Sequence, residues 1–90
     1  MNITIKDKNI KIKGGFRAMM LFERILAESG ENISSITSLV QYFWCCVISS
    51  KDGEDITYDE FVDWLDENPN EFTNFNEWMS KQNNLFPKKN

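Results

Sequence analysis

The sequence predicts a mostly α-helical fold with a small β part, in which an N-terminal β-hairpin packs on a compact bundle of about four helices. Isoleucines alternate with polar residues over positions 2 to 13, which is the two-residue period of a strand. The rest of the chain carries apolar residues at helical spacing, with capping residues at the ends. Hydrophobic residues make up 41% of the 90 positions, enough for one core. We expect a single domain over residues 1–90, divided into a hairpin (1–14), a bundle (15–86) and a frayed tail (87–90).

The hairpin is predicted from an isoleucine face opposite a basic face. Asp7-Lys8-Asn9 is the predicted turn, and Gly14-Gly15 ends the second strand. A hairpin alone is marginally stable in water, so we expect its apolar face to lie on the helices. That face consists of Ile3, Ile5, Ile10 and Ile12.

The first helix is predicted from about Phe16 to Glu28, with Ser29-Gly30 ending it. On a helical wheel its apolar residues form a wide arc, and Arg17, Arg24 and Glu28 lie opposite. Glu23 falls near the middle of that arc. A carboxylate in such a place is either held by donors within the protein or exposed where the arc meets a partner. The arc contains Phe16, Met19, Met20, Phe22, Leu26 and Ala27.

The second helix is predicted over about Ser34 to Ser49. Its second half, LVQYFWCCVI, is apolar nearly all round, which is typical of a helix buried at the centre of a small bundle. The β-branched and aromatic residues leave a strand as an alternative for this run, but its length and its serine start favour a helix.

The third helix begins with Thr57 as N-cap and Glu60 three residues later, a capping box, and Asn68-Pro69 ends it. Its apolar face, predicted to be core, contains Tyr58, Phe61, Val62, Trp64 and Leu65. Its opposite, acidic face contains Asp59, Glu60, Asp63, Asp66 and Glu67. A fourth helix is predicted from about Asn70 to Leu85, with a stripe of Phe72, Phe75, Trp78, Met79 and Phe86.

Composition argues against several classes of function. The formal net charge of −4 disfavours nucleic-acid binding, and the absence of histidine disfavours a zinc site. Cys45 and Cys46 are adjacent, so they suit inert core thiols in a reducing cytoplasm rather than a disulfide framework. The N-terminus lacks a signal-peptide core, and the longest apolar run is about half of a membrane span. We expect a cytoplasmic, non-enzymatic protein without a cofactor or a membrane span.

Residues 49–69 resemble the exit half of a calcium-binding EF-hand, but the ligands do not fit. With Ile56 at the hydrophobic eighth position of the loop, Glu60 takes the twelfth and fits. Ser49, Lys51 and Gly53 then stand where carboxylate ligands are needed. A shift by one residue places an aspartate at the hydrophobic position and an isoleucine as the first ligand. The capped amphipathic helix explains this half without a metal.

Charge is segregated along the chain, with lysines and arginines in residues 1–30 and most carboxylates in residues 51–77. The carboxylates are interpreted as a solvated helix face that keeps the domain soluble. Alternatively, they form an acidic surface that meets a basic partner or the basic hairpin of a second copy.

Three stretches, ITIKDKNIKIKGGFRAMMLFERI, YFWCCVISS and DITYDEFVDWLDENP, together resemble the small tail assembly chaperones of long-tailed bacteriophages and prophages, in particular those of Bacteroides-type elements. The resemblance covers most of the chain. It implies a non-enzymatic helical protein of the infected host's cytoplasm. Such a protein would coat the tape measure protein, keep its apolar helices soluble, and leave as tail tube subunits polymerise.

The residues offer a surface for such binding on the first helix, because methionines on an apolar face adapt to varied helices. The candidate partner-binding residues are Phe16, Met19, Met20 and Glu23. The first rival function is an acidic regulator or DNA mimic that docks on a basic partner through Asp59, Glu60, Asp63, Asp66 and Glu67. A second rival is a degenerate EF-hand-like metal binder.

Overall fold

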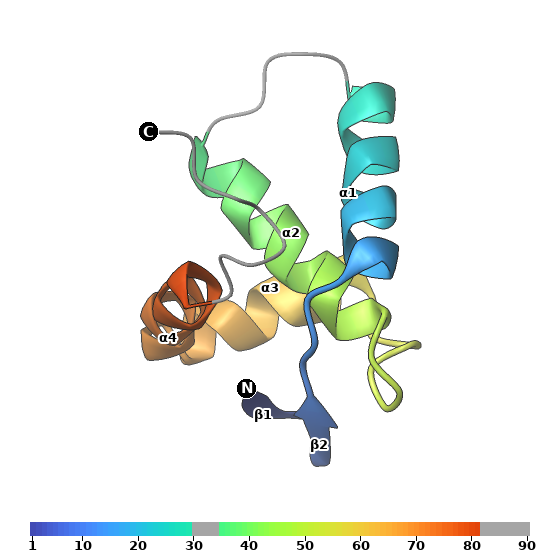
Figure 1. Ribbon diagram of the computed structural model, residues 1–90. Helices are drawn as coiled ribbons and strands as arrows, with labels where there is room; N and C mark the ends of the chain where they lie inside the picture. The colour runs from blue at the N-terminus through green and yellow to red at the C-terminus, as the bar shows by residue number, and fades with distance from the viewer. Residues whose placement is uncertain (30–34, 82–90) are drawn as a thin grey trace.

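A computed structural model describes residues 1–29 and 35–81 of the chain. These residues form an antiparallel two-stranded hairpin followed by four helices, so the predicted fold class is confirmed (Figure 1). The helix α2 crosses the middle of the molecule, with α1 packed beside it, α3 and α4 on another side, and the hairpin at the lower end in Figure 1. The elements are β1 (Asn2–Ile5), β2 (Lys8–Lys11), α1 (Phe16–Ser29), α2 (Ser35–Ile48), α3 (Tyr58–Glu67) and α4 (Asn70–Ser80).

The hairpin turn lies one residue earlier than the sequence predicted. Lys6 and Asp7 occupy it with φ of 54° and 64°, as in a two-residue type I′ turn, and Lys8 already belongs to β2. The predicted turn over Asp7-Lys8-Asn9 is therefore wrong. The pairing of Ile3 with Ile10 explains the shift, because a slip by one residue would turn one strand's isoleucines away from the core.

The isoleucine face of the hairpin lies on the helices, as expected. Its four isoleucines are at most 2% exposed and belong to the same core cluster as α2, α3 and α4. The indole Nε1 of Trp64 in α3 donates a hydrogen bond to the Thr4 carbonyl at 2.8 Å. The hairpin is therefore fixed both by burial of its side chains and by a polar contact with β1.

The centre of the core is α2, which confirms the helical interpretation of its apolar run. Phe43 is fully buried and stacks on Phe75 of α4, with ring centroids 4.1 Å apart, and meets Phe61 of α3 edge-on at 4.9 Å. Burial raises the pKa of Cys45 to about 11 and that of Cys46 to about 12. Both thiols therefore stay protonated at neutral pH, which makes them poor nucleophiles.

The connection between α2 and α3 folds back tightly on the end of α2. A Cβ atom at Gly53 would collide with the Val47 carbonyl oxygen, so this close approach requires glycine. The Trp44 indole in α2 donates to the Ile56 carbonyl at 2.9 Å. These contacts place Thr57 at the start of α3.

The predicted capping box of α3 is confirmed. The Thr57 hydroxyl accepts from the Glu60 amide at 3.1 Å, and the Glu60 carboxylate accepts from the Thr57 amide at 3.0 Å. The fourth helix is confirmed from Asn70 to Ser80. Its predicted end at Leu85, the apolar Phe86 and the predicted tail lie outside the described residues, as does the predicted start of the second helix at Ser34.

Replacing Phe61 by alanine should cost about 3–5 kcal/mol of unfolding free energy, the usual loss for a buried phenylalanine. The side chain is 0% exposed and contacts Phe43, so its removal leaves a cavity at the junction of α2 and α3. Urea unfolding followed by far-UV circular dichroism measures the change. Asp63→Ala, at an exposed position of the same helix, is the control. A Phe61→Ala midpoint equal to that of the wild type would contradict the assignment of this face to the core.

Candidate functional site

The helix α1 is apolar on two sides, of which one faces the core. Ala18 is 1% exposed, and Leu21, Phe22 and Ile25 pack against the buried cluster. The Phe22 ring meets the Tyr42 ring of α2 edge-on, with centroids 5.4 Å apart. One side of α1 is thus used to build the fold.

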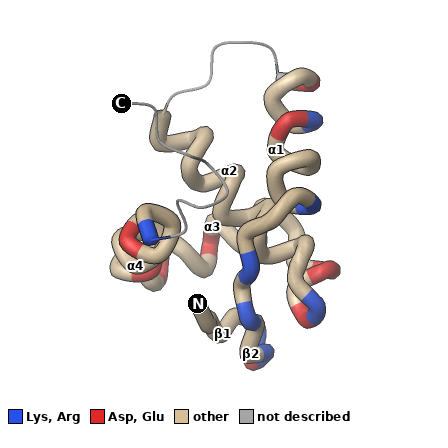
Figure 2. Tube along the Cα trace, viewed as in Figure 1, with Lys and Arg blue, Asp and Glu red and all other residues tan. Residues whose placement is uncertain are grey.

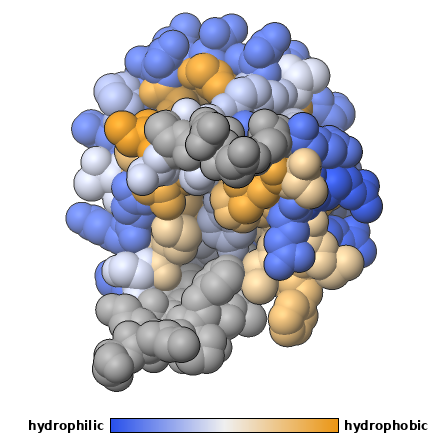
Figure 3. Space-filling model, turned by 90° about the horizontal axis from the view of Figure 1, so that it is seen from above, coloured by the Kyte–Doolittle hydropathy of each residue, from blue (hydrophilic) through white to orange (hydrophobic). Residues whose placement is uncertain are grey.

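The opposite side of α1 carries apolar residues that the fold does not use. Phe16 is 71% exposed and Met20 is 65% exposed. Ala27, seven residues after Met20 on the same helix, is also exposed. Together with Glu23 they follow the i, i+4, i+7, i+11 spacing of one helix face. We name Phe16, Met20, Glu23 and Ala27 the outward stripe. Seen from above, apolar patches interrupt the polar surface of the molecule (Figure 3).

The structure separates the four predicted partner-binding residues. Met19 is half-buried and packs against the core, so the expectation that both methionines lie on one exposed surface is wrong. Glu23 is exposed, and no hydrogen bond or ion pair of its carboxylate occurs within residues 1–29 and 35–81. Of the two alternatives for Glu23, the structure therefore favours exposure beside Phe16 and Met20.

Positive charge borders the outward stripe. Arg17 and Arg24 are both exposed and, with Met20 and Leu21, line an open depression of about 410 Å³. The sequence predicted these arginines on the side opposite the apolar arc. They lie instead next to Met20, because the core-facing side of α1 includes Ala18, Leu21 and Ile25, which the predicted arc left out. Basic residues also continue from α1 into β2 (Figure 2).

The predicted acidic face of α3 is exposed except at one position. Asp59, Asp63, Asp66 and Glu67 are exposed, whereas Glu60 is half-buried and engaged twice within the chain. Besides capping α3, the Glu60 carboxylate accepts from the Lys6 ammonium at 2.9 Å. The carboxylate of Glu60 is therefore occupied by contacts within the folded chain.

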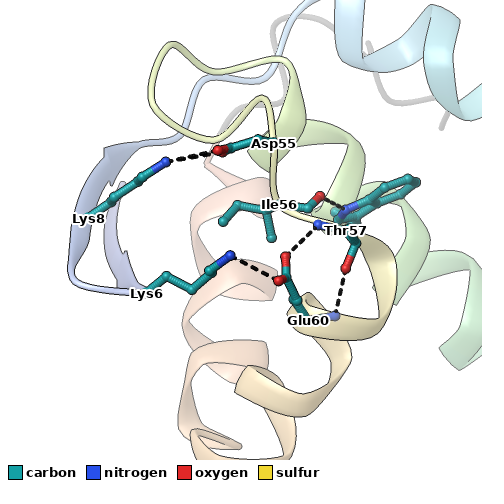
Figure 4. A network of polar contacts seen from close by, with 7 residues as sticks. Lys6, Lys8, Asp55, Ile56, Thr57 and Glu60 are labelled. Atoms are coloured by element: carbon teal, nitrogen blue, oxygen red, sulfur yellow. Dashed lines mark hydrogen bonds and ion pairs between the residues drawn. The ribbon is translucent and has the colours of Figure 1, made fainter.

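A second ion pair ties the hairpin to the connection before α3. The Lys8 ammonium lies 3.1 Å from the Asp55 carboxylate, next to the pair of Lys6 and Glu60 (Figure 4). Two of the four hairpin lysines thus meet carboxylates of their own chain. The segregation of charge in the sequence is partly explained by these internal contacts, although exposed pairs contribute little stability.

These contacts shift the pKa of the groups involved. The hydrogen bond from the Thr57 amide, and next the one from Lys6, lower the pKa of Glu60. The hydrogen bond from Lys8 lowers the pKa of Asp55 below its usual range. The hydrogen bond to Glu60 raises the pKa of Lys6. Both carboxylates are therefore stabilised in their charged form.

Two further observations concern metal binding and membrane-spanning helices. Within the described ranges 1–29 and 35–81, no three or more Asp, Glu, His or Cys side chains are grouped so that they could hold a metal ion. No helix in the described part of the chain combines the length and apolarity needed to cross a membrane.

Comparison of the chain with protein-family models, with curated proteins and with solved structures gave no match.

Protonating Asp55 and Glu60 should destabilise the fold. Their folded-state pKa values lie below the ordinary 3.8 and 4.5, so their stabilisation is present above those values and is lost as the pH falls through the lowered ones. Urea midpoints at a series of pH values from about 6 down to about 2 measure the effect. Asp55→Asn with Glu60→Gln should lower the midpoint at the highest pH and reduce its fall with acid.

The matched control for this experiment is Asp63→Asn with Asp66→Asn, since both side chains are exposed and form no ion pair within the described residues. This control should keep the acid dependence that belongs to Asp55 and Glu60. An equal fall of the midpoint in the wild type and in the Asp55/Glu60 variant would show that these contacts do not stabilise the fold.

Proposed function

We propose that the protein is a non-enzymatic chaperone of phage tail assembly, which binds apolar helices of the tape measure protein and meets tail tube subunits. The observation that carries the proposal is the exposure of Phe16 and Met20 on a folded helix. Exposed apolar groups of this kind mark binding or self-association sites when they are contiguous. The resemblance of the sequence to tail assembly chaperones supplies the identity of the partners.

A helix is the form of partner that suits this surface. Phe16, Met20 and Ala27 lie along one side of a single rigid helix, and helices pack by placing side-chain ridges of one into grooves of the other. Methionine is unbranched and adapts to partners of differing shape. A chaperone that covers many segments of one long helical protein needs such tolerance.

The chemistry of the described residues supports binding rather than catalysis. Cys45 and Cys46 are buried with raised pKa values, and Asp55 and Glu60 are committed to ion pairs with lysines. The chain contains no histidine. Its two free, buried cysteines suit the reducing cytoplasm of a bacterial host, where phage tails assemble.

The acidic surface of α3 supports a second candidate function. Four carboxylates, Asp59, Asp63, Asp66 and Glu67, are exposed on one short helix. A surface of this kind can dock on a basic protein, including one that normally binds DNA. Such a complex would weaken steeply with salt, whereas binding through the outward stripe would depend chiefly on apolar contacts.

Co-expression with the tape measure protein tests the proposal. Phe16→Glu with Met20→Glu should abolish co-purification and leave the far-UV circular dichroism spectrum intact, because both side chains point away from the core. Met19 is left unchanged because it packs against the core. Thr73→Glu with Asn74→Glu adds the same charge at exposed positions of α4 and should not affect binding.

The rival predicts the opposite pattern in the same experiment. Reversing Asp59, Asp63 and Asp66 to lysine would then destroy binding at low salt, while the Phe16 and Met20 changes would have no effect. That pattern would refute the proposal and favour an acidic regulator.

A further inference from the structure

We infer that the outward stripe binds an amphipathic helix whose own apolar stripe is bordered by carboxylates. The inference rests on the proposed role of α1 and specifies the chemistry of the partner segment. It depends on the apolar residues of the outward stripe and on the charged residues that border it.

The apolar part of the surface sets the length of the contact. Phe16 and Ala27 are eleven positions apart, which is roughly 16 Å along a helix at its usual rise. A partner helix of about three turns would cover this distance. Both Phe16 and Met20 project far enough to be about two-thirds exposed, so they can enter the grooves of such a helix.

The charges beside the stripe are arranged asymmetrically. At about 100° per residue, Arg17 and Arg24 fall on one border of the stripe, with the exposed Glu28 one turn after Arg24, and Glu23 falls on the other border. The two arginines lie about two turns apart and line one depression with Met20 and Leu21. A guanidinium group binds a carboxylate with two parallel hydrogen bonds, and its stem packs on apolar groups. The arginine border therefore suits a partner with carboxylates beside its apolar residues.

Further positive charge extends this border toward the hairpin. Lys11 and Lys13 are exposed, and within residues 1–29 and 35–81 neither they nor the two arginines form an ion pair. Lys6 and Lys8, by contrast, are engaged with Glu60 and Asp55. In a chain of net charge −4, the segment from β2 to α1 thus carries four cations that form no ion pair with any residue that the structure describes. Figure 2 shows the run of basic positions along this segment.

A second copy of the chain fits this surface less well than a separate helix. The carboxylates of α3 are exposed, but its apolar side chains are committed to the core, with Phe61 fully buried and Trp64 and Leu65 packed against the cluster. The acidic helix α4 likewise buries Phe75. On α3 and α4, another copy would therefore offer carboxylates without an exposed apolar stripe beside them. Its own outward stripe carries a single carboxylate, Glu23, against the two arginines Arg17 and Arg24.

Binding of synthetic helices to the full chain tests the inference. Three labelled peptides of about 18 residues carry the same leucine stripe, with glutamate, glutamine or lysine along one border. Fluorescence anisotropy should show about tenfold tighter binding of the glutamate peptide than of the lysine peptide at low salt. The difference should shrink at high salt, because exposed charges are screened.

Variants separate the two parts of the surface. Arg17→Gln with Arg24→Gln should remove the preference for glutamate and retain binding of the glutamine peptide. Phe16→Ser with Met20→Ser should weaken binding of all three peptides. The matched control is Lys51→Gln with Lys81→Gln, since both lysines are exposed and lie outside α1 and the hairpin. It should leave the preference unchanged.

Several results would overturn the inference: equal affinity for the three peptides, a preference that survives the arginine changes, or undiminished binding by the Phe16/Met20 variant. Binding to phosphatidylglycerol vesicles in place of the peptides would assign the surface to a membrane. Arginine-dependent self-association in sedimentation, without peptide binding, would assign it to a second copy. Capture of the tape measure protein without any peptide preference would refute this inference alone. A glutamate preference without capture would support it and refute the proposed function.

Discussion

The stacking of Phe43 on Phe75, together with the edge contact of Phe43 with Phe61, holds three helices on one buried side chain. All three rings are 0% exposed. Because α2 supplies Phe43 and is apolar nearly all round, α3, α4 and the isoleucine face of the hairpin pack around it. The amphipathic character of those elements follows from that position, since each needs just one apolar face to complete the core.

The free side of α1 is a consequence of this arrangement. The helix contributes Ala18 and Leu21 to the shell around α2, and within the described residues no element packs on its other side. A chain of 90 residues has little material for a further layer. Phe16 and Met20 therefore stay outside a core that is complete without them. The proposed chaperone role uses the side of α1 that stays exposed in the folded protein.

The sequence predicted the elements well where one local signal was sufficient. The capping box of Thr57 and Glu60, the isoleucine alternation and the apolar α2 each depend on neighbouring residues, and all three are confirmed. The buried face of α1 was predicted wrongly, because the predicted arc left out Ala18, Leu21 and Ile25, which pack on the core. The signal that could have identified it is the i, i+3, i+4, i+7 spacing of Ala18, Leu21, Phe22 and Ile25.

The long-range contacts could not be predicted from the sequence either. Lys6 and Glu60 are 54 positions apart, and Lys8 and Asp55 are 47 apart, so nothing local pairs them. The acidic face predicted as one unit therefore includes a residue, Glu60, that forms an ion pair with the hairpin. The turn was misplaced by one residue because an Asp-Lys-Asn run suggests a turn by composition, whereas the isoleucine register fixes where it lies.

The central claim is that packing on α2 gives α1 one buried and one free side, and methionine methyl groups report on it directly. Met19 and Met20 are neighbours in sequence but lie on different sides of the helix. In a sample labelled with ¹³C at the methionine methyl groups, a soluble paramagnetic chelate should broaden the Met20 signal far more than that of Met19. Equal broadening of the two signals would contradict the account, because it would mean that α1 does not hold one face against the core.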